Sequence, residues 1–359
     1  MSIVYQVLGK AGHDNALFVW VTSGQAIHRL LFDCGENCVA EVPYTDVLAI
    51  DHLFFSHLHM DHIGGFDTFF RSVFNRTSRR NAVWGPPGTS RIMHHRFRGF
   101  LWNLNADQPG QWFVHDIYPD YIDRFRYDVS EAFERAHIAG REPHRLPCHG
   151  MPQGYPARST QRGFGRQLLD EATFTVEALH MEHAGPSLAY LIREKPRFNV
   201  DRAKLAELGL QPGPWLERVK VRRADEASLL ELDGATYELA ALRETLLVEK
   251  PGESLAYLTD FILDQAALEQ LVPALHGYQT LICESQYCHA DALLAQRNFH
   301  MTAVQAAELA RQAQVERLIL FHISDRYDRR EWLALLDEAR AIFPNTTFPQ
   351  HWGLTEANV

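Results

Sequence analysis

Short runs of β-branched and aromatic residues, separated by Gly, Asp and Asn, dominate the first 60 residues of the chain. Such runs, bounded by turn residues, predict β-strands. Four strands are expected here, at Ile3–Leu8, Leu17–Thr22, Ile27–Phe32 and in a buried run from Val47 to Ser56. Similar runs predict further strands at Thr173–Leu179, Ser187–Ile192, Leu246–Glu249, Ser254–Thr259, Thr280–Glu284 and Arg317–Phe321.

Amphipathic patterns predict helices mainly late in the chain. Thr302 and Gln305 have the spacing of a capping box, which predicts a helix over Thr302–Gln314. Asp328–Phe343 is expected to form another helix, ended by Pro344. Because strands come first and then alternate with helices, the order favours an α/β fold of stacked sheets with outer helices.

Charge is distributed unevenly along the 359 residues, whose formal net charge is −10. An acidic chain is not typical of a dedicated nucleic-acid binder. Two segments are basic, however: residues 89–166 carry 11 Arg and 8 acids, and residues 193–223 carry 9 Lys and Arg and 4 acids. We therefore expect a single domain over 1–359 with two insertions, a candidate lid at 89–170 and a second inserted segment at 193–245.

Several classes of protein are disfavoured by the composition. Hydrophobic residues make up 46 % and charged residues 22 %, as in ordinary globular proteins. The N-terminal residues do not have the pattern of a signal peptide, and no apolar run approaches the roughly 18 residues of a membrane span. The cysteines do not have disulfide-scaffold spacing, so reduced thiols and a cytoplasmic location are expected; they are Cys34, Cys38, Cys148, Cys283 and Cys288.

The strongest chemical signal is the segment Ser56-His57-Leu58-His59-Met60-Asp61-His62, which follows an apolar strand and precedes a helical run at Phe66–Phe74. His57 and His59 are two residues apart, so in extended backbone their rings can project to one side. Asp61 and His62 come where the chain turns into the helix. Three imidazoles and a carboxylate in six residues suit Zn²⁺ or a similar borderline metal.

This motif resembles that of the metallo-β-lactamase superfamily, whose fold is a four-layer αββα sandwich with a metal pair at the sheet edges. The remaining motifs resemble, in order, those of the ribonuclease Z group of tRNA 3′-end endonucleases. They are Leu31–Glu36, Gly85–Thr89, His183–Tyr190, Pro212–Pro214 with Val219-Lys220, Thr259-Asp260, Leu281–Tyr287, His300–Ala303 and Leu320–Tyr327.

The resemblance implies a dinuclear site with two divalent ions, Zn²⁺ or alternatively Mn²⁺ or Fe²⁺. One ion would be held by His57, His59 and His183, the other by Asp61, His62 and His322, with Asp260 as the bridge. It also implies that His300 donates a proton to the leaving 3′ oxygen, a suitable role for an imidazole. Asp61 is counted as catalytic as well, and Glu284 as a residue that orients His300 or a ligand.

Some of these residues have an ordinary structural alternative. His180 lies three residues from His183 and competes with it as the ligand. Asp260 could instead cap a helix over Phe261–Leu271, and His300 could be a plain loop histidine. The histidines of the 89–166 segment, including His94, His95 and His149, fit no ligand spacing, and we interpret them as part of a surface insertion.

The sequence supports a metal-dependent phosphodiesterase that cleaves tRNA precursors at their 3′ end. The alternatives are hydrolysis of a small phosphodiester such as a cyclic nucleotide, a metal-stabilised binding protein, and a lactamase or thioesterase, since fold alone does not decide chemistry. The altered segments Leu8–His13, Gly35–Cys38 and Trp215–Arg218 face the substrate in the family, and they keep the small-substrate alternative open. The resemblance also implies that the 193–245 insertion is a flexible arm that clamps tRNA, and it suggests a homodimer. No membrane partner is expected.

Overall fold

A computed structural model describes residues 2–22, 26–143, 166–220 and 229–354 of the chain. It divides into two compact units, one formed by Met1–Arg193 with Glu253–Val359 and the other by Glu194–Gly252. Among the described residues, none of the helices has the length and apolar character needed to cross a bilayer.

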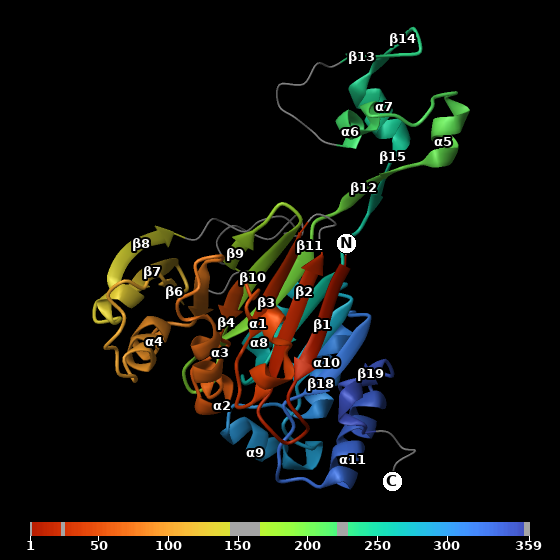
Figure 1. The fold of residues 1–359 in the computed structure, drawn as a ribbon. Helices are drawn as coiled ribbons and strands as arrows, with labels where there is room; N and C mark the ends of the chain where they lie inside the picture. The colour runs from red at the N-terminus through yellow and green to blue at the C-terminus, as the bar shows by residue number, and fades with distance from the viewer. Residues whose placement is uncertain (1, 23–25, 144–165, 221–228, 355–359) are drawn as a thin grey trace. The chain divides into compact units, whose positions relative to one another are not determined.

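An eight-stranded sheet opens the larger unit, with its strands in sequence order (Figure 1). Strands β3 to β6 run parallel, and antiparallel pairs flank them on both sides. Parallel strands covered on both faces are apolar throughout, and every residue of β5 is buried. The strands are β1 (Ser2–Leu8), β2 (Ala16–Thr22), β3 (Ile27–Phe32), β4 (His52–Phe54), β5 (Asn81–Gly85), β6 (Gln111–Ile117), β7 (Tyr121–Asp128) and β8 (His137–Pro143).

A seven-stranded sheet forms the second half of this unit, in the order β19-β18-β17-β16-β11-β10-β9. Strands β16 to β19 are parallel, and β11 joins β16 antiparallel. Their bounds are β9 (Arg166–Asp170), β10 (Phe174–Glu182), β11 (Pro186–Glu194), β16 (Ser254–Leu258), β17 (Thr280–Glu284), β18 (Arg317–Phe321) and β19 (Thr346–Thr347).

The two sheets pack face to face and helices cover both outer faces, which gives four αββα layers. The central layer is aromatic, with the Phe32 and Phe54 rings stacked at 4.8 Å and Tyr190 and Tyr257 against them. Helices α3 (Phe66–Val73) and α4 (Thr89–Phe97) cover the first sheet. The second sheet is covered by α8 (Gln265–Leu275), α10 (Ala303–Gln312) and α11 (Arg329–Arg340). The predicted fold class is therefore confirmed.

Short helices complete the larger unit: α1 (Tyr44–Val47), α2 (Met60–Ile63) and α9 (Ala292–Arg297), with 3₁₀ turns at Cys38–Glu41, Val129–Glu131, His289–Asp291 and Gln350–Trp352. The capping box at the start of α10 is present as predicted, since the side chain of Thr302 accepts a backbone N–H group. Helix α11 also begins with a capping box, formed by Asp328 and Glu331. Helix α11 ends at Arg340, before the expected Phe343.

One expectation about the first sheet needs correction. The run from Val47 to Ser56 is not one strand, because α1 ends at Val47 and only His52–Phe54 pair in the sheet. The described part of the 89–170 segment provides α4, strands β6, β7 and β8 of the first sheet, and β9 of the second. Since β6 pairs with β5, these residues extend the sheet rather than interrupt it. A lid role for the segment stays a prediction.

The described residues of the smaller unit form two antiparallel strand pairs and three short helices. Strand β12 (Arg197–Val200) pairs with β15 (Leu247–Lys250), and β13 (Leu229–Leu232) pairs with β14 (Ala235–Glu238). The helices are α5 (Arg202–Glu207), α6 (Trp215–Lys220) and α7 (Leu239–Leu246). Arg243 of α7 donates hydrogen bonds to the carbonyls of Arg218 and Val219, so it ties α7 to α6. This unit lies where the arm-like insertion was predicted, and its role stays a prediction.

Candidate metal centre

The candidate metal ligands and Glu284 lie at or just after the ends of strands in both sheets. The His57–His62 segment follows β4, and His183 follows β10 directly. Asp260 comes two residues after β16, Glu284 is the last residue of β17, and His322 follows β18. Because β16, β17 and β18 are parallel, their carboxyl ends meet at one sheet edge, and residues far apart in sequence are brought together there.

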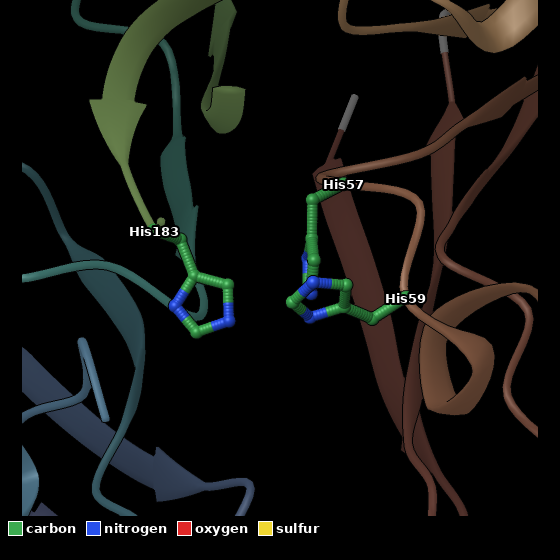
Figure 2. Close-up of side chains that lie close together, drawn as sticks. All are labelled: His57, His59 and His183. Carbon is green, nitrogen blue, oxygen red and sulfur yellow. The ribbon is translucent and has the colours of Figure 1, made fainter. Parts of the chain in front are cut away.

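Three imidazoles form the first group. Ligand nitrogens of His57, His59 and His183 all lie within 4.8 Å of one another. Figure 2 shows the ring of His183 facing those of His57 and His59 from the opposite side of the site. The Nδ1 of His183 lies 2.8 Å from the carbonyl oxygen of Phe299, which can only accept. His183 therefore carries its proton on Nδ1, and its Nε2 has a free lone pair for a metal.

Asp61, His62, Asp260 and His322 form the second group, again with ligand atoms within 4.8 Å. The Asp260 carboxylate lies 3.3 Å from His62 Nε2 and from His322 Nδ1. It also lies 3.7 Å from His57 Nε2 and 3.8 Å from His183 Nε2, both members of the first group. Asp260 is thus the side chain that both groups share.

The donor set fits divalent metal ions. His57 Nε2 and His62 Nε2 are buried and form no hydrogen bond, whereas buried polar atoms normally have a partner. Burial lowers the pKa of His57 to about 2, so the ring is neutral and its lone pair is available. Imidazole nitrogens and carboxylate oxygens at this spacing are the ligands that Zn²⁺ and similar ions take.

The carboxylates in this cluster are held ionised. Burial alone would raise the pKa of Asp260, but His322 and His62 lower it well below its usual value. The rings of His322 and His62, 3.5 and 3.3 Å from its carboxylate, likewise lower the pKa of Asp61 against the effect of burial. Ionised carboxylates are the form in which Asp61 and Asp260 can bind a divalent cation.

Asp33 supports the cluster from behind. It is fully buried after β3, and its Oδ2 accepts hydrogen bonds from His62 Nδ1 at 2.9 Å, Ser56 Oγ at 2.8 Å and Tyr257 Oη at 2.9 Å. Its Oδ1 accepts the backbone N–H of Ser56 at 2.7 Å. Fixing Nδ1 of His62 in this way aims Nε2 at the cluster.

Glu284 and His300 form a hydrogen-bonded pair beside the cluster. His300 Nδ1 lies 3.0 Å from Glu284 Oε2, and the other oxygen, Oε1, accepts the backbone N–H of Phe261 at 3.0 Å. Burial alone would lower the pKa of His300, but Glu284 raises it to about 9. A protonated imidazole beside the ligands can act as a general acid.

Backbone strain shapes the strand ends at this edge. Asp33, Asp260 and His322 have φ angles of 58°, 38° and 51°, in the left-handed region that non-glycine residues rarely adopt. Such strain is concentrated at functional sites. Here the left-handed conformation turns the backbone sharply after β3, β16 and β18, so that the side chains of Asp33, Asp260 and His322 lie at the site.

All the sequence-predicted ligands, together with His300 and Glu284, lie in this cluster. Within the described part of the chain, His180 stays on β10, outside the ligand groups. The alternative of Asp260 as a helix cap is wrong, because α8 begins at Gln265 and is capped by Asp264. His94 lies on α4 and bonds the carbonyl of Phe133, while His149 lies outside the described residues.

Sequence reasoning gave Asp33 no role in the site. The available signal was its position, since an acidic residue directly follows an apolar strand at the edge that carries the histidine motif. Its partners Ser56 and Tyr257 are 23 and 224 residues away, which no local pattern reveals.

Known proteins show the same architecture and much of the same sequence. Residues 10–127 match a family described as the anti-Pycsar protein Apyc1, and residues 210–323 match a β-lactamase superfamily domain. A ribonuclease Z from Deinococcus radiodurans is 44 % identical over 96 % of this chain and 97 % of its own length.

Two solved structures carry the fold at low identity. The metallo-β-lactamase fold protein YhfI from Bacillus subtilis has a TM-score of 0.53 at 14 % identity, over 96 % of this chain and 95 % of its own. The short form of human tRNase Z has a TM-score of 0.52 at 16 % identity, over 97 % and 96 %.

Proposed function

The chain belongs to the ribonuclease Z family, and we propose that it is a metal-dependent endonuclease that cleaves tRNA precursors at their 3′ end. The observation that carries this proposal is the 44 % identity to a ribonuclease Z across nearly both whole chains. The cluster of histidines and carboxylates at the sheet edge supports it, because that cluster fits metal-assisted hydrolysis of a phosphodiester.

Two divalent ions, Zn²⁺ by preference and Mn²⁺ or Fe²⁺ as alternatives, would complete the site. His57, His59 and His183 would hold one ion, Asp61, His62 and His322 the other, and Asp260 would contact both. Such ions activate water at neutral pH and stabilise negative charge on phosphoryl oxygens. Asp33 keeps His62 oriented for this task.

The scissile phosphate would reach the site past His59, Met60 and Asp61. Met60 is 79 % exposed and the Asp61 side chain 43 % exposed, whereas the Asp260 side chain is 2 % exposed. On the inner side, His300 would donate a proton to the leaving 3′ oxygen, and Glu284 keeps that imidazole protonated.

The smaller unit, Glu194–Gly252, would serve as the RNA-gripping arm of the family. Its first half carries the basic residues of the 193–223 segment, and Lys and Arg contacts to phosphates supply most non-specific RNA affinity. By the same resemblance we propose a cytoplasmic homodimer in which the arm of one subunit serves the site of the other.

A combined metal and two-substrate assay tests the function. We expect about two ions per chain by mass spectrometry of the metal content, and cleavage of a precursor tRNA at its 3′ end. His59→Ala should lose precursor cleavage and hydrolysis of bis(p-nitrophenyl) phosphate together. Hydrolysis of a cyclic nucleotide with every precursor left intact would instead favour the small-phosphodiester alternative.

A further inference from the structure

A long stretch of the first sheet region contains arginine but no acidic residue. Residues 68–106 hold seven Arg and no Asp or Glu, in a chain whose net charge is −10. The stretch covers most of α3, all of β5 and α4, and the loop after α4. Such a concentration of one charge in an acidic protein marks a surface for an anionic partner.

Four of these arginines have structural partners. They are Arg76, bonded to the carbonyls of Leu48 and Ile50; Arg79, paired with Asp51; Arg80, over the ring of Phe113; and Arg96, paired with Asp67. The other three, Arg71, Arg91 and Arg98, are exposed, and among the described residues they form no ion pair. Their charges are therefore available to a ligand.

Two of these arginines lie on one face of α4. Arg91, His95 and Arg98 are spaced i, i+4 and i+7 along α4 and its C-cap, so they share one face, and all three are exposed. Met93 and Phe97 are buried against the sheet. We call Arg91, His95 and Arg98 the basic face; Arg71 lies on the neighbouring α3.

Helices α3 and α4 lie side by side (Figure 1), joined by the Asp67–Arg96 pair at 3.4 Å. Asp67 is the acid nearest in sequence to this surface, and Arg96 neutralises it. Arg71 follows Phe70, whose ring stacks at 5.9 Å on Phe100, directly after the α4 C-cap region. Phe100 is 46 % exposed and Leu101 is 86 % exposed, so apolar surface borders the basic face.

The basic face begins at the same sheet edge as the metal centre. Strands β4 and β5 are parallel neighbours, and directly after β4 the N–H of Phe55 donates to the carbonyl of Trp84 in β5 at 2.7 Å. His57 follows Phe55 by two residues, and α4 starts at Thr89, four residues after β5. A polyanion held at the metal centre is therefore close to the start of α4.

We propose that the basic face is a second RNA-contact surface, which holds backbone phosphates of the precursor beside the scissile bond. This inference rests on the proposed function and adds to it a contact outside the arm. Guanidinium groups that lack internal partners suit phosphate oxygens. The exposed ring of Phe100 can stack on an unpaired base. This feature favours RNA over an anionic membrane as the partner.

A charge-removal experiment tests the surface. The variant Arg91→Gln/Arg98→Gln is compared with Arg311→Gln/Arg330→Gln, which removes the same charge from exposed arginines of α10 and α11. Each lost phosphate contact should reduce the slope of log kcat/KM against log salt by about 0.7–0.9, and weaken binding about 5-fold at 0.1 M salt. We expect kcat/KM for precursor tRNA to fall about 25-fold in the first variant only.

Three further readings keep the outcome unambiguous. Hydrolysis of bis(p-nitrophenyl) phosphate should be unchanged in both variants, which also shows that they fold. Arg91→Lys/Arg98→Lys keeps the charge and should restore most of the salt slope. Equal precursor kcat/KM and salt slope in the glutamine variant and the wild type would overturn the inference, as would a loss confined to binding of anionic phosphatidylserine vesicles. A wild type inactive on every precursor would instead refute the proposed function.

Discussion

Replacing Asp33 by Asn should test the hydrogen bonds that support the site while leaving every proposed metal ligand in place. Both carboxylate oxygens of Asp33 are occupied: Oδ2 accepts from Ser56 Oγ, His62 and Tyr257, and Oδ1 accepts the Ser56 N–H. An asparagine has one oxygen only. In its better orientation, the amide NH₂ faces the Ser56 N–H, which has no lone pair to offer.

The cost follows from this geometry. Losing a hydrogen bond to a charged acceptor costs about 1.5–3 kcal/mol, and leaving buried donors unpaired adds about 1–3 kcal/mol. We therefore expect Asp33→Asn to lower the free energy of unfolding by about 3–5 kcal/mol. Mutation of a residue that hydrogen-bonds a metal ligand typically lowers metal affinity 10- to 100-fold. We expect a loss of about this size in Asp33→Asn, because the hydrogen bond that orients His62 is altered.

Asp116 provides the matched control. It is also buried, and its two oxygens accept the backbone N–H and hydroxyl of Ser90 at 2.6 and 2.7 Å, outside the metal cluster. Asp116→Asn should lose stability in urea unfolding and keep wild-type affinity in a competitive zinc titration. Equal metal affinity in the two variants, or a loss below about 1 kcal/mol in Asp33→Asn, would refute the reasoning.

Two more predictions concern single histidines. His300→Gln should lower kcat for precursor tRNA about 10²- to 10⁴-fold, as for loss of a general acid. Hydrolysis of bis(p-nitrophenyl) phosphate should stay nearly intact, because nitrophenolate leaves without a proton. An equal loss on both substrates in stopped assays would count against the proton-donor role. His115 stacks on Trp84 at 3.7 Å, and burial lowers its pKa to about 3. The neutral His115 ring contributes to the free energy of unfolding above about pH 6.5, and this contribution is lost as the pH falls, by about 1.4 kcal/mol per pH unit. His115→Gln should therefore flatten the pH dependence of urea unfolding between pH 6.5 and 4. Unchanged unfolding curves would contradict this prediction.

The basic residues show how far composition can mislead. The net charge of −10 is a sum over the chain, and it does not reveal the basic segments within it. The 89–166 segment was interpreted as an insertion, because its charge and aromatic content differ from those of the flanking strands. Strands β6 and β7 nevertheless extend the sheet, with Val114 and Tyr127 buried in its outer core. Strand propensity depends on what a pleated surface packs against, which the local pattern does not contain.

The sequence by itself indicated the main candidate metal ligands. The His57–His62 motif and the capping box at Thr302 are local signals, each readable within about ten residues. The order of strands and helices indicated stacked sheets with outer helices, whereas the four-layer class and the ligand roles of Asp260 and His322 came from the family resemblance. The local signals depend on side-chain periodicity and spacing, which are properties of the chain before it folds.

The tertiary structure alone decided which residues act together. Asp33 meets Tyr257 across 224 residues, and Asp260 became the shared carboxylate only because parallel strands end at one edge. The positive φ angles of Asp33, Asp260 and His322 are imposed by packing, since no residue of these types prefers them strongly. Which of the seven arginines of residues 68–106 stay free depends likewise on partners that other elements supply.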